Sequence, residues 1–166
     1  MKQSKILDNI QDQMKPGKIT LSGFLGNDDR KLIDILTEDD AKVKRMDLSH
    51  EEIAQKMIYF KDKGLKGLGE FIKVPPHFEV RVDSVRGKIP CPFGDPGVFK
   101  KINTTVKNLD KNMEITYTDL NIHMIYAHGF YEGKGSDFRL EPKKIITTLE
   151  IKSSDFDYNL TNRKED

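Results

Sequence analysis

The sequence contains a single cysteine, Cys91, among its 166 residues. An internal disulfide bond needs two cysteines, and a chain this poor in cysteine is typical of a reducing compartment. The sequence also lacks any apolar run approaching the ~18 residues of a membrane-spanning helix. Residues 1–17 lack the apolar stretch of a signal peptide. We therefore expect a cytoplasmic protein with no membrane-bound part.

An excess of charge of one sign is also absent, with 28 Lys and Arg against 27 Asp and Glu, a net charge of +1. This balance gives no overall field to attract nucleic acid or an anionic membrane, so neither is an expected partner. Hydrophobic residues make up 36% of the chain, enough to argue against general disorder. The length and the lack of internal repeats predict one domain over residues 1–152, followed by a polar, flexible tail over 153–166.

Helical signals dominate residues 1–70. Ser49 followed by Glu52 has the spacing of a capping box, and Ile53, Met57 and Phe60 then recur on one face. An earlier helix is expected to begin after Asn27, a residue type that caps helices well. The first part of the chain is therefore predicted to be mainly helical.

Strand signals dominate residues 71–118. The segment 78–85 alternates apolar and polar residues, and residues 98–119 form two strand-like runs separated by turn formers at 108–112. These patterns predict an α+β fold in which the helical N-terminal part packs on a mainly antiparallel sheet. A short helix and a Gly-rich loop are expected near the C-terminal end.

Residues 86–97 concentrate three prolines and three glycines, which fix a particular loop path. Two interpretations stay open. The segment is either a rigid connection between strands or a binding loop that presents Arg86, Lys88, Cys91 or Asp95 to a ligand.

The predicted short helix is expected to be capped by Thr118 and to stop at Gly129. It carries two histidines, His123 and His128. Their spacing of five residues corresponds to about 140° around a regular helix, which does not place both rings on one face. His128 falls in the last turn, where a cap at the carbonyl end of the helix explains it equally well. If the protein is an enzyme, these two histidines are its candidate general acid or base, because histidine titrates near neutral pH.

The Gly-rich segment 129–136 departs from the phosphate-binding loop of nucleotide-binding proteins, because the glycine spacing is short and a helix precedes it. Backbone N–H groups in such a turn can still form a concavity for an anion. Lys134, Ser136 and Arg139 supply suitable donors, and Arg86 is a further candidate. A purely structural loop is the alternative.

A metal site is a weaker alternative. Cys91, His77, His123 and His128 would form a Cys-His₃ set if the fold brought them together, but no pair has the short spacing typical of zinc ligands. A nucleophilic pair of Cys91 with a histidine is also open.

The leading functional prediction is a protein that binds a small anionic ligand, such as a phosphate or carboxylate compound, through residues 86–97 and 123–139. The alternative is a non-enzymatic inhibitor, interaction protein or assembly factor with a protein partner. A third hypothesis is a helix-turn-helix module for DNA over residues 49–64, which requires a tight turn near 57–59. The patterns leave open whether the protein is an enzyme, which cofactor it takes and its oligomeric state.

Overall fold

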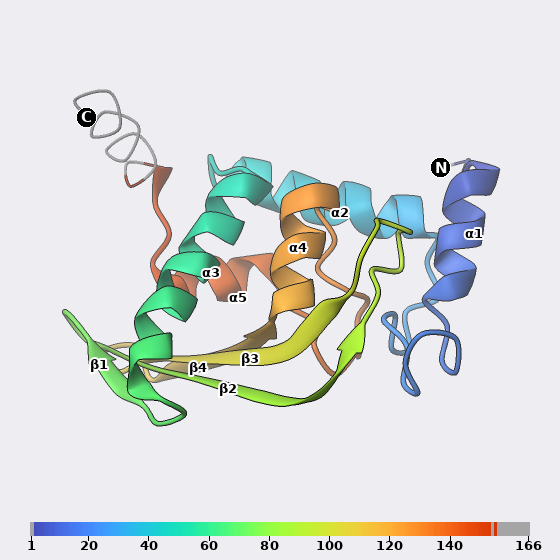
Figure 1. Ribbon diagram of the computed structural model, residues 1–166. Helices are drawn as coiled ribbons and strands as arrows, with labels where there is room; N and C mark the ends of the chain where they lie inside the picture. The colour runs from blue at the N-terminus through green and yellow to red at the C-terminus, as the bar shows by residue number, and fades with distance from the viewer. Residues whose placement is uncertain (1, 154, 156–166) are drawn as a thin grey trace, which may run out of the picture.

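A computed structural model describes residues 2–153 and residue 155, and it consists of helices packed on one face of an antiparallel sheet (Figure 1). The sheet has four strands in the order β1-β2-β3-β4. They are β1 (Ile72–Val74), β2 (Phe78–Ile89), β3 (Phe99–Asn108) and β4 (Met113–Thr118). The helices are α1 (Lys5–Gln13), α2 (Leu32–Arg45), α3 (His50–Gly64), α4 (Asp119–His128) and α5 (Pro142–Leu149), and a 3₁₀ turn, η1 (Leu65–Gly67), follows α3. The predicted α+β class is confirmed.

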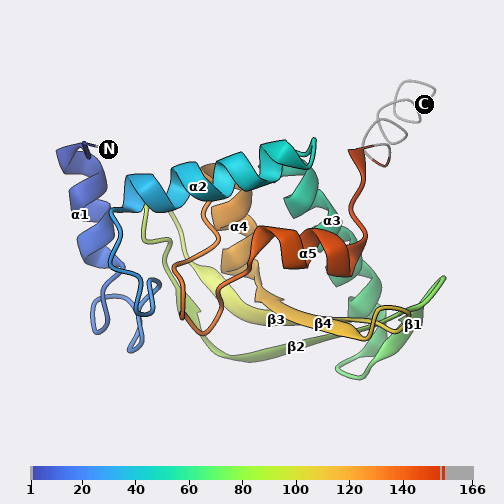
Figure 2. The same cartoon turned by 180° about the vertical axis from the view of Figure 1, so that it is seen from behind.

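The strands form a meander in which each pairs with its neighbour in sequence. The β3–β4 hairpin turns between Asn108 and Met113, as the turn-forming residues predicted. Helices α3, α4 and α5 lie against the sheet, and α2 runs across their outer side (Figure 2). Within the part of the chain that the structure describes, no helix covers the opposite face of the sheet (Figures 1 and 2).

Two apolar clusters hold these layers together. The larger joins α3 to the sheet, where Met57 and Phe60 meet Val80 and Tyr117. Tyr117 is fully buried, and its hydroxyl donates a hydrogen bond of 2.8 Å to the carbonyl of Met57. The smaller cluster lies beside α1 and the start of α2. Its buried members are Met14, Phe24, Leu25, Leu32, Ile35, Cys91, Leu120, Met124 and Phe130.

The predicted helix ends are confirmed at three positions. Ser49 and Glu52 form both hydrogen bonds of a capping box at α3. Thr118 caps α4, and Gly129 ends it in the left-handed region at φ 62°. Because α3 continues unbroken from His50 to Gly64, residues 57–59 are helical where a helix-turn-helix module would need its turn.

Three elements differ from expectation. Helix α2 begins at Leu32 and not after Asn27, because the Asp28 side chain bonds instead to the backbone and guanidinium of Arg30. Strand β2 extends to Ile89 across an irregularity between Ser84 and Lys88, so the predicted loop is shorter. Helix α5 was not predicted, although Pro142 in its first turn is a recognised helix-start signal.

Among the described residues, none of the helices combines the length and apolar character needed to cross a bilayer. The predicted tail over residues 153–166 lies almost entirely outside the described residues and stays a prediction.

Candidate metal centre

The segment that follows β2 turns sharply at Cys91. The N–H of Gly94 donates to the carbonyl of Cys91 at 3.0 Å, and Gly94 has a φ of 88°, which favours glycine. The ligand atoms of Cys91 and Asp95, at the two ends of this turn, lie within 4.8 Å of each other. The turn therefore presents the Cys91 sulfur and the Asp95 carboxylate on the same side.

Helix α4 brings its two histidines to this turn. The Nε2 atoms of His123 and His128 lie 2.6 and 2.5 Å from the same oxygen of Asp95, Oδ2. The helical spacing alone suggested that the rings diverge. They converge because the carboxylate lies between them and because His128 is the last residue of α4.

Four donor groups meet at this point. One ligand atom from each of Cys91, Asp95, His123 and His128 lies within 4.8 Å of the other three. In a tetrahedral zinc site, metal–ligand distances of about 2.0–2.3 Å place two donors roughly 3.3–3.7 Å apart. A thiolate, a carboxylate and two imidazoles are all ligands that zinc accepts in proteins. The arrangement therefore has the donor types of a mononuclear zinc site, and its donors, from 2.5 Å to at most 4.8 Å apart, reach that spacing with shifts of about 1 Å.

The electrostatics of the cluster follow from these contacts. Hydrogen bonds from His128 and His123 hold the pKa of Asp95 at about 2, so the carboxylate is ionised. An ionised carboxylate only accepts, so each Nε2 carries the proton of its hydrogen bond. Burial raises the pKa of Cys91 to about 11, with the Asp95 charge adding to the effect. A bound cation would replace the two imidazole protons and the thiol proton as the partner of these groups.

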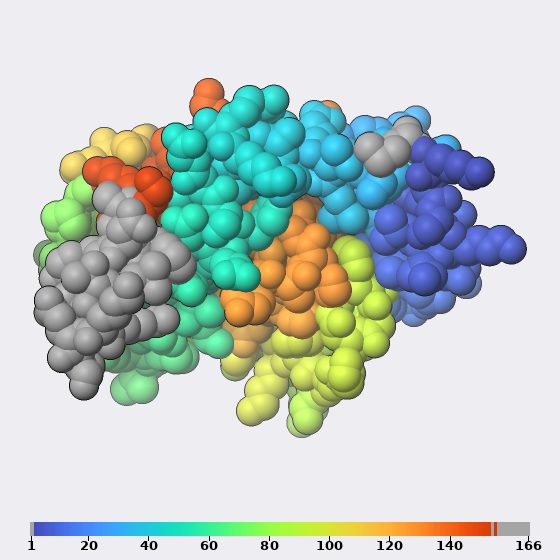
Figure 3. Space-filling view, turned by 90° about the horizontal axis from the view of Figure 1, so that it is seen from above, coloured from blue at the N-terminus to red at the C-terminus, as the bar shows by residue number. Residues whose placement is uncertain are grey.

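Aromatic rings pack against both imidazole rings. Phe93 stacks on His128 with ring centroids 3.9 Å apart and planes within 7°, and Phe99 lies 4.6 Å from His123. Cys91 is buried, whereas the other three donors keep side-chain exposures of 22–31%. In the space-filling view, α4 and the segment that follows β2 reach the surface side by side (Figure 3). The site is thus packed against aromatic rings and accessible from solvent.

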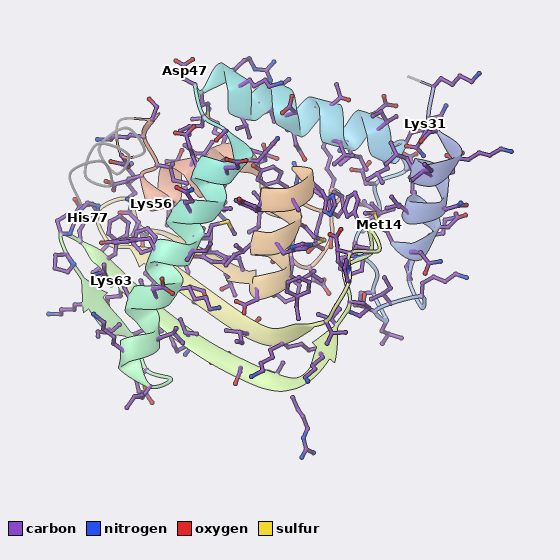
Figure 4. The ribbon with its side chains drawn as sticks, turned by 45° about the horizontal axis from the view of Figure 1, so that its top comes forward. Met14, Lys31, Asp47, Lys56, Lys63 and His77 are labelled. Carbon is purple, nitrogen blue, oxygen red and sulfur yellow. The ribbon has the colours of Figure 1, made fainter. Side chains whose placement is uncertain are left out.

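The predicted metal set included His77 in place of Asp95. His77 lies at the β1–β2 turn, on the far side of the molecule from Met14, which packs in the same cluster as Cys91 (Figure 4). Its Nε2 bonds to Glu150 at 2.5 Å, so His77 takes no part in the donor cluster. The sequence pattern indicated Asp95 only as one of the residues that the loop over 86–97 could present to a ligand. The signal that would have identified it is its position four residues after Cys91 on a Pro- and Gly-fixed turn.

The predicted anion-binding residues are not brought together with the histidines. Arg139 forms a two-pronged ion pair with the buried Asp39, at 2.5 and 2.9 Å, and a further one with Glu141. The hydroxyl of Ser136 donates to Glu132 at 2.7 Å. The Lys134 side chain is exposed, and Arg86 is exposed on β2.

Comparisons with protein-family models, curated proteins and solved structures found no match for this chain. The assignment of a site therefore depends on geometry and chemistry alone.

Proposed function

We propose that this protein binds a divalent transition-metal ion, Zn²⁺ in the first place, through Cys91, Asp95, His123 and His128. The observation that carries the proposal is the convergence of these four donors within 4.8 Å of one another. Two segments about 30 residues apart in sequence supply them, each held by its own backbone hydrogen bonds.

The donor types favour zinc over the hard cations. Mg²⁺ and Ca²⁺ prefer oxygen ligands, whereas imidazole and thiolate select zinc, copper, cobalt or nickel. Four protein donors complete a tetrahedron and leave no position for water, which is typical of structural zinc sites. The ion would then tie the turn at residues 91–95 to the C-terminal half of α4.

The test is metal content and affinity of the purified full chain. The protein should be purified without chelator and analysed by native mass spectrometry, with one zinc ion per chain expected. Titration with Co²⁺ should give the visible absorption of a tetrahedral site together with a thiolate-to-cobalt charge-transfer band. Cys91→Ser should abolish that charge-transfer band.

Three variants make the test specific. Asp95→Asn and His123→Asn should each weaken zinc binding by more than the ~10–100-fold that loss of an outer partner costs. His77→Gln is the matched control, because it removes a histidine that lies outside the cluster. Zinc binding that is unchanged in His123→Asn, or lost equally in His77→Gln, would contradict the proposal.

The prediction of a protein that binds a small phosphate or carboxylate compound stays a prediction, as does the alternative of an inhibitor or assembly factor. Among the described side chains, the donor cluster is the feature that points most directly to a ligand.

A further inference from the structure

A second pocket lies at the end of the sheet nearest to α1. It has a volume of about 330 Å³ and is enclosed by residues 20–24, the ends of β2 and β3, and residues 132–138. Figure 2 shows these three parts of the chain meeting there. Ligand pockets commonly begin at about 300 Å³. The apolar part of its wall comes from Leu21, Phe24, Val85, Ile89, Leu120 and Phe138.

Two lysines, Lys100 and Lys101 of β3, lie at the exposed edge of this pocket. Across the β2–β3 ladder, Lys88 is paired directly opposite Lys100, and Arg86 is exposed on the same strand. Among the described residues, none of these four cations forms an ion pair. This end of the β2–β3 pair therefore carries an uncompensated positive charge. The like charges of Lys88 and Lys100 lie directly opposite each other, an arrangement that destabilises a strand pair.

Two acidic residues also line the pocket, and their state matters for its selectivity. Glu132 is 4% exposed, and its carboxyl group already accepts hydrogen bonds of 2.7 Å from Asn121 and from Ser136. Burial raises the pKa of Glu132 to about 7. Asp137 is exposed at the edge. The unpaired charge at the entrance is therefore mainly positive.

We infer that this pocket binds a small amphipathic anion, with its apolar body between the apolar side chains and its carboxylate or phosphate group at Lys100 and Lys101. Charge complementarity selects the acidic head group, and the apolar wall selects the body. The inference is independent of the metal proposal, because the pocket shares no lining residue with the four metal donors.

The experiment compares four probes with the same eight-carbon chain by isothermal titration calorimetry. Octanoate and octyl phosphate carry the two kinds of acidic head, whereas 1-octanol is neutral and octyltrimethylammonium is cationic. We expect at least one acidic probe to bind at least tenfold more tightly than the cation. Equal or tighter binding of the cation would overturn the inference, because Glu132 and Asp137 would then determine selectivity.

Substitutions of pocket residues test where the acidic head group of the probe binds. Lys100→Gln/Lys101→Gln should weaken the acidic probe at least tenfold without lowering the melting temperature. The matched control is Lys73→Gln/Lys143→Gln, which removes two exposed lysines outside the pocket. Phe138→Ala should weaken octanol and the acidic probe alike. Unchanged affinity for the acidic probe in the Lys100/Lys101 variant would refute the assigned head-group position.

Two further measurements separate this site from others. Inorganic phosphate that binds as tightly as octyl phosphate would reveal a site for bare anions and overturn the amphipathic part of the inference. Octanoate should bind equally well in the presence and in the absence of excess chelator. Loss of binding with chelator would place the anion at the metal centre and not in this pocket.

Discussion

At the scale of single residues, the buried charges differ in how their surroundings satisfy them. Arg139 and Asp39 compensate each other, with side-chain exposures of 10% and 1%. Glu132 has only neutral hydrogen-bond donors at its carboxyl group, from Asn121 and Ser136. Removing the charge of Arg139 should therefore destabilise the folded protein, whereas removing the charge of Glu132 should stabilise it at neutral pH.

Arg139→Met should destabilise the protein by about 3–5 kcal/mol, because it removes both close hydrogen bonds to the buried Asp39 and leaves only the longer ion pair with Lys42 at 3.8 Å. Chemical denaturation measures this loss. Asp39→Leu/Arg139→Met should recover much of it, since no isolated charge remains. As a control, Lys15→Met breaks an exposed pair with Asp12 and should cost at most about 1 kcal/mol. A stable Arg139→Met variant would show that this ion pair contributes little.

Glu132 should make stability depend on pH. Its pKa is about 7 in the folded protein against an ordinary 4.5, so the folded state binds the proton more tightly than the unfolded state. Stability from this group is present below about pH 4.5 and falls as the pH rises to about 7. The total loss is roughly 3 kcal/mol at about 1.4 kcal/mol per pKa unit.

Glu132→Gln removes that titration. Relative to wild type, this variant should become more stable as the pH is raised from 5 to 8, measured by denaturation at each pH. Glu70→Gln, an exposed control, should follow the wild-type curve. Parallel curves for Glu132→Gln and wild type would mean that burial does not shift this group.

At the scale of elements, the two segments 24–27 and 132–136 pack backbone against backbone. The N–H of Gly133 donates to the carbonyl of Phe24 at 2.9 Å, and that of Asn27 donates to Lys134 at 3.2 Å. A Cβ atom at Gly133 would lie 2.4 Å from the carbonyl oxygen of Leu25. The requirement for glycine here comes from lack of space, since the φ of Gly133 is not positive.

Gly133→Ala should therefore destabilise the protein by about 1–3 kcal/mol, because the backbone of residue 25 must move. Thermal denaturation provides the measurement. Gly67→Ala is the control, since its Cβ would find the nearest atom at 3.4 Å and its φ is not positive. Equal melting temperatures for the two variants would show that the segments separate easily.

At the scale of the whole molecule, the proposed metal ion would connect the end of β2 to α4. Zinc at about 100 times its dissociation constant should stabilise the folded protein by about 2.7 kcal/mol. For a chain of this size, that corresponds to a rise in melting temperature of about 5–11 °C, which excess chelator should reverse. Asp95→Asn should show a much smaller rise, and an equal rise in that variant would place the zinc elsewhere.

The sequence by itself determined the fold class and several local features. Period-two alternation predicted the strands, and the capping residues Ser49 and Thr118 marked where α3 and α4 begin. These features depend on neighbours within about four positions along the chain, so they can be read without the fold. The start of α2 was predicted too early because the Asp28 side chain pairs with Arg30, and Lys134 from a distant segment bonds to it as well.

Only the tertiary structure determined the composition of the candidate sites. The sequence named Cys91, His123 and His128 among weaker alternatives, but the side chain that lies with them is Asp95, because the turn after β2 faces α4. The same sequence offered Arg139 as an anion ligand, whereas the fold places it against Asp39, 100 positions away. Contacts at such separations depend on how the helices pack on the sheet, and local patterns carry no information about them.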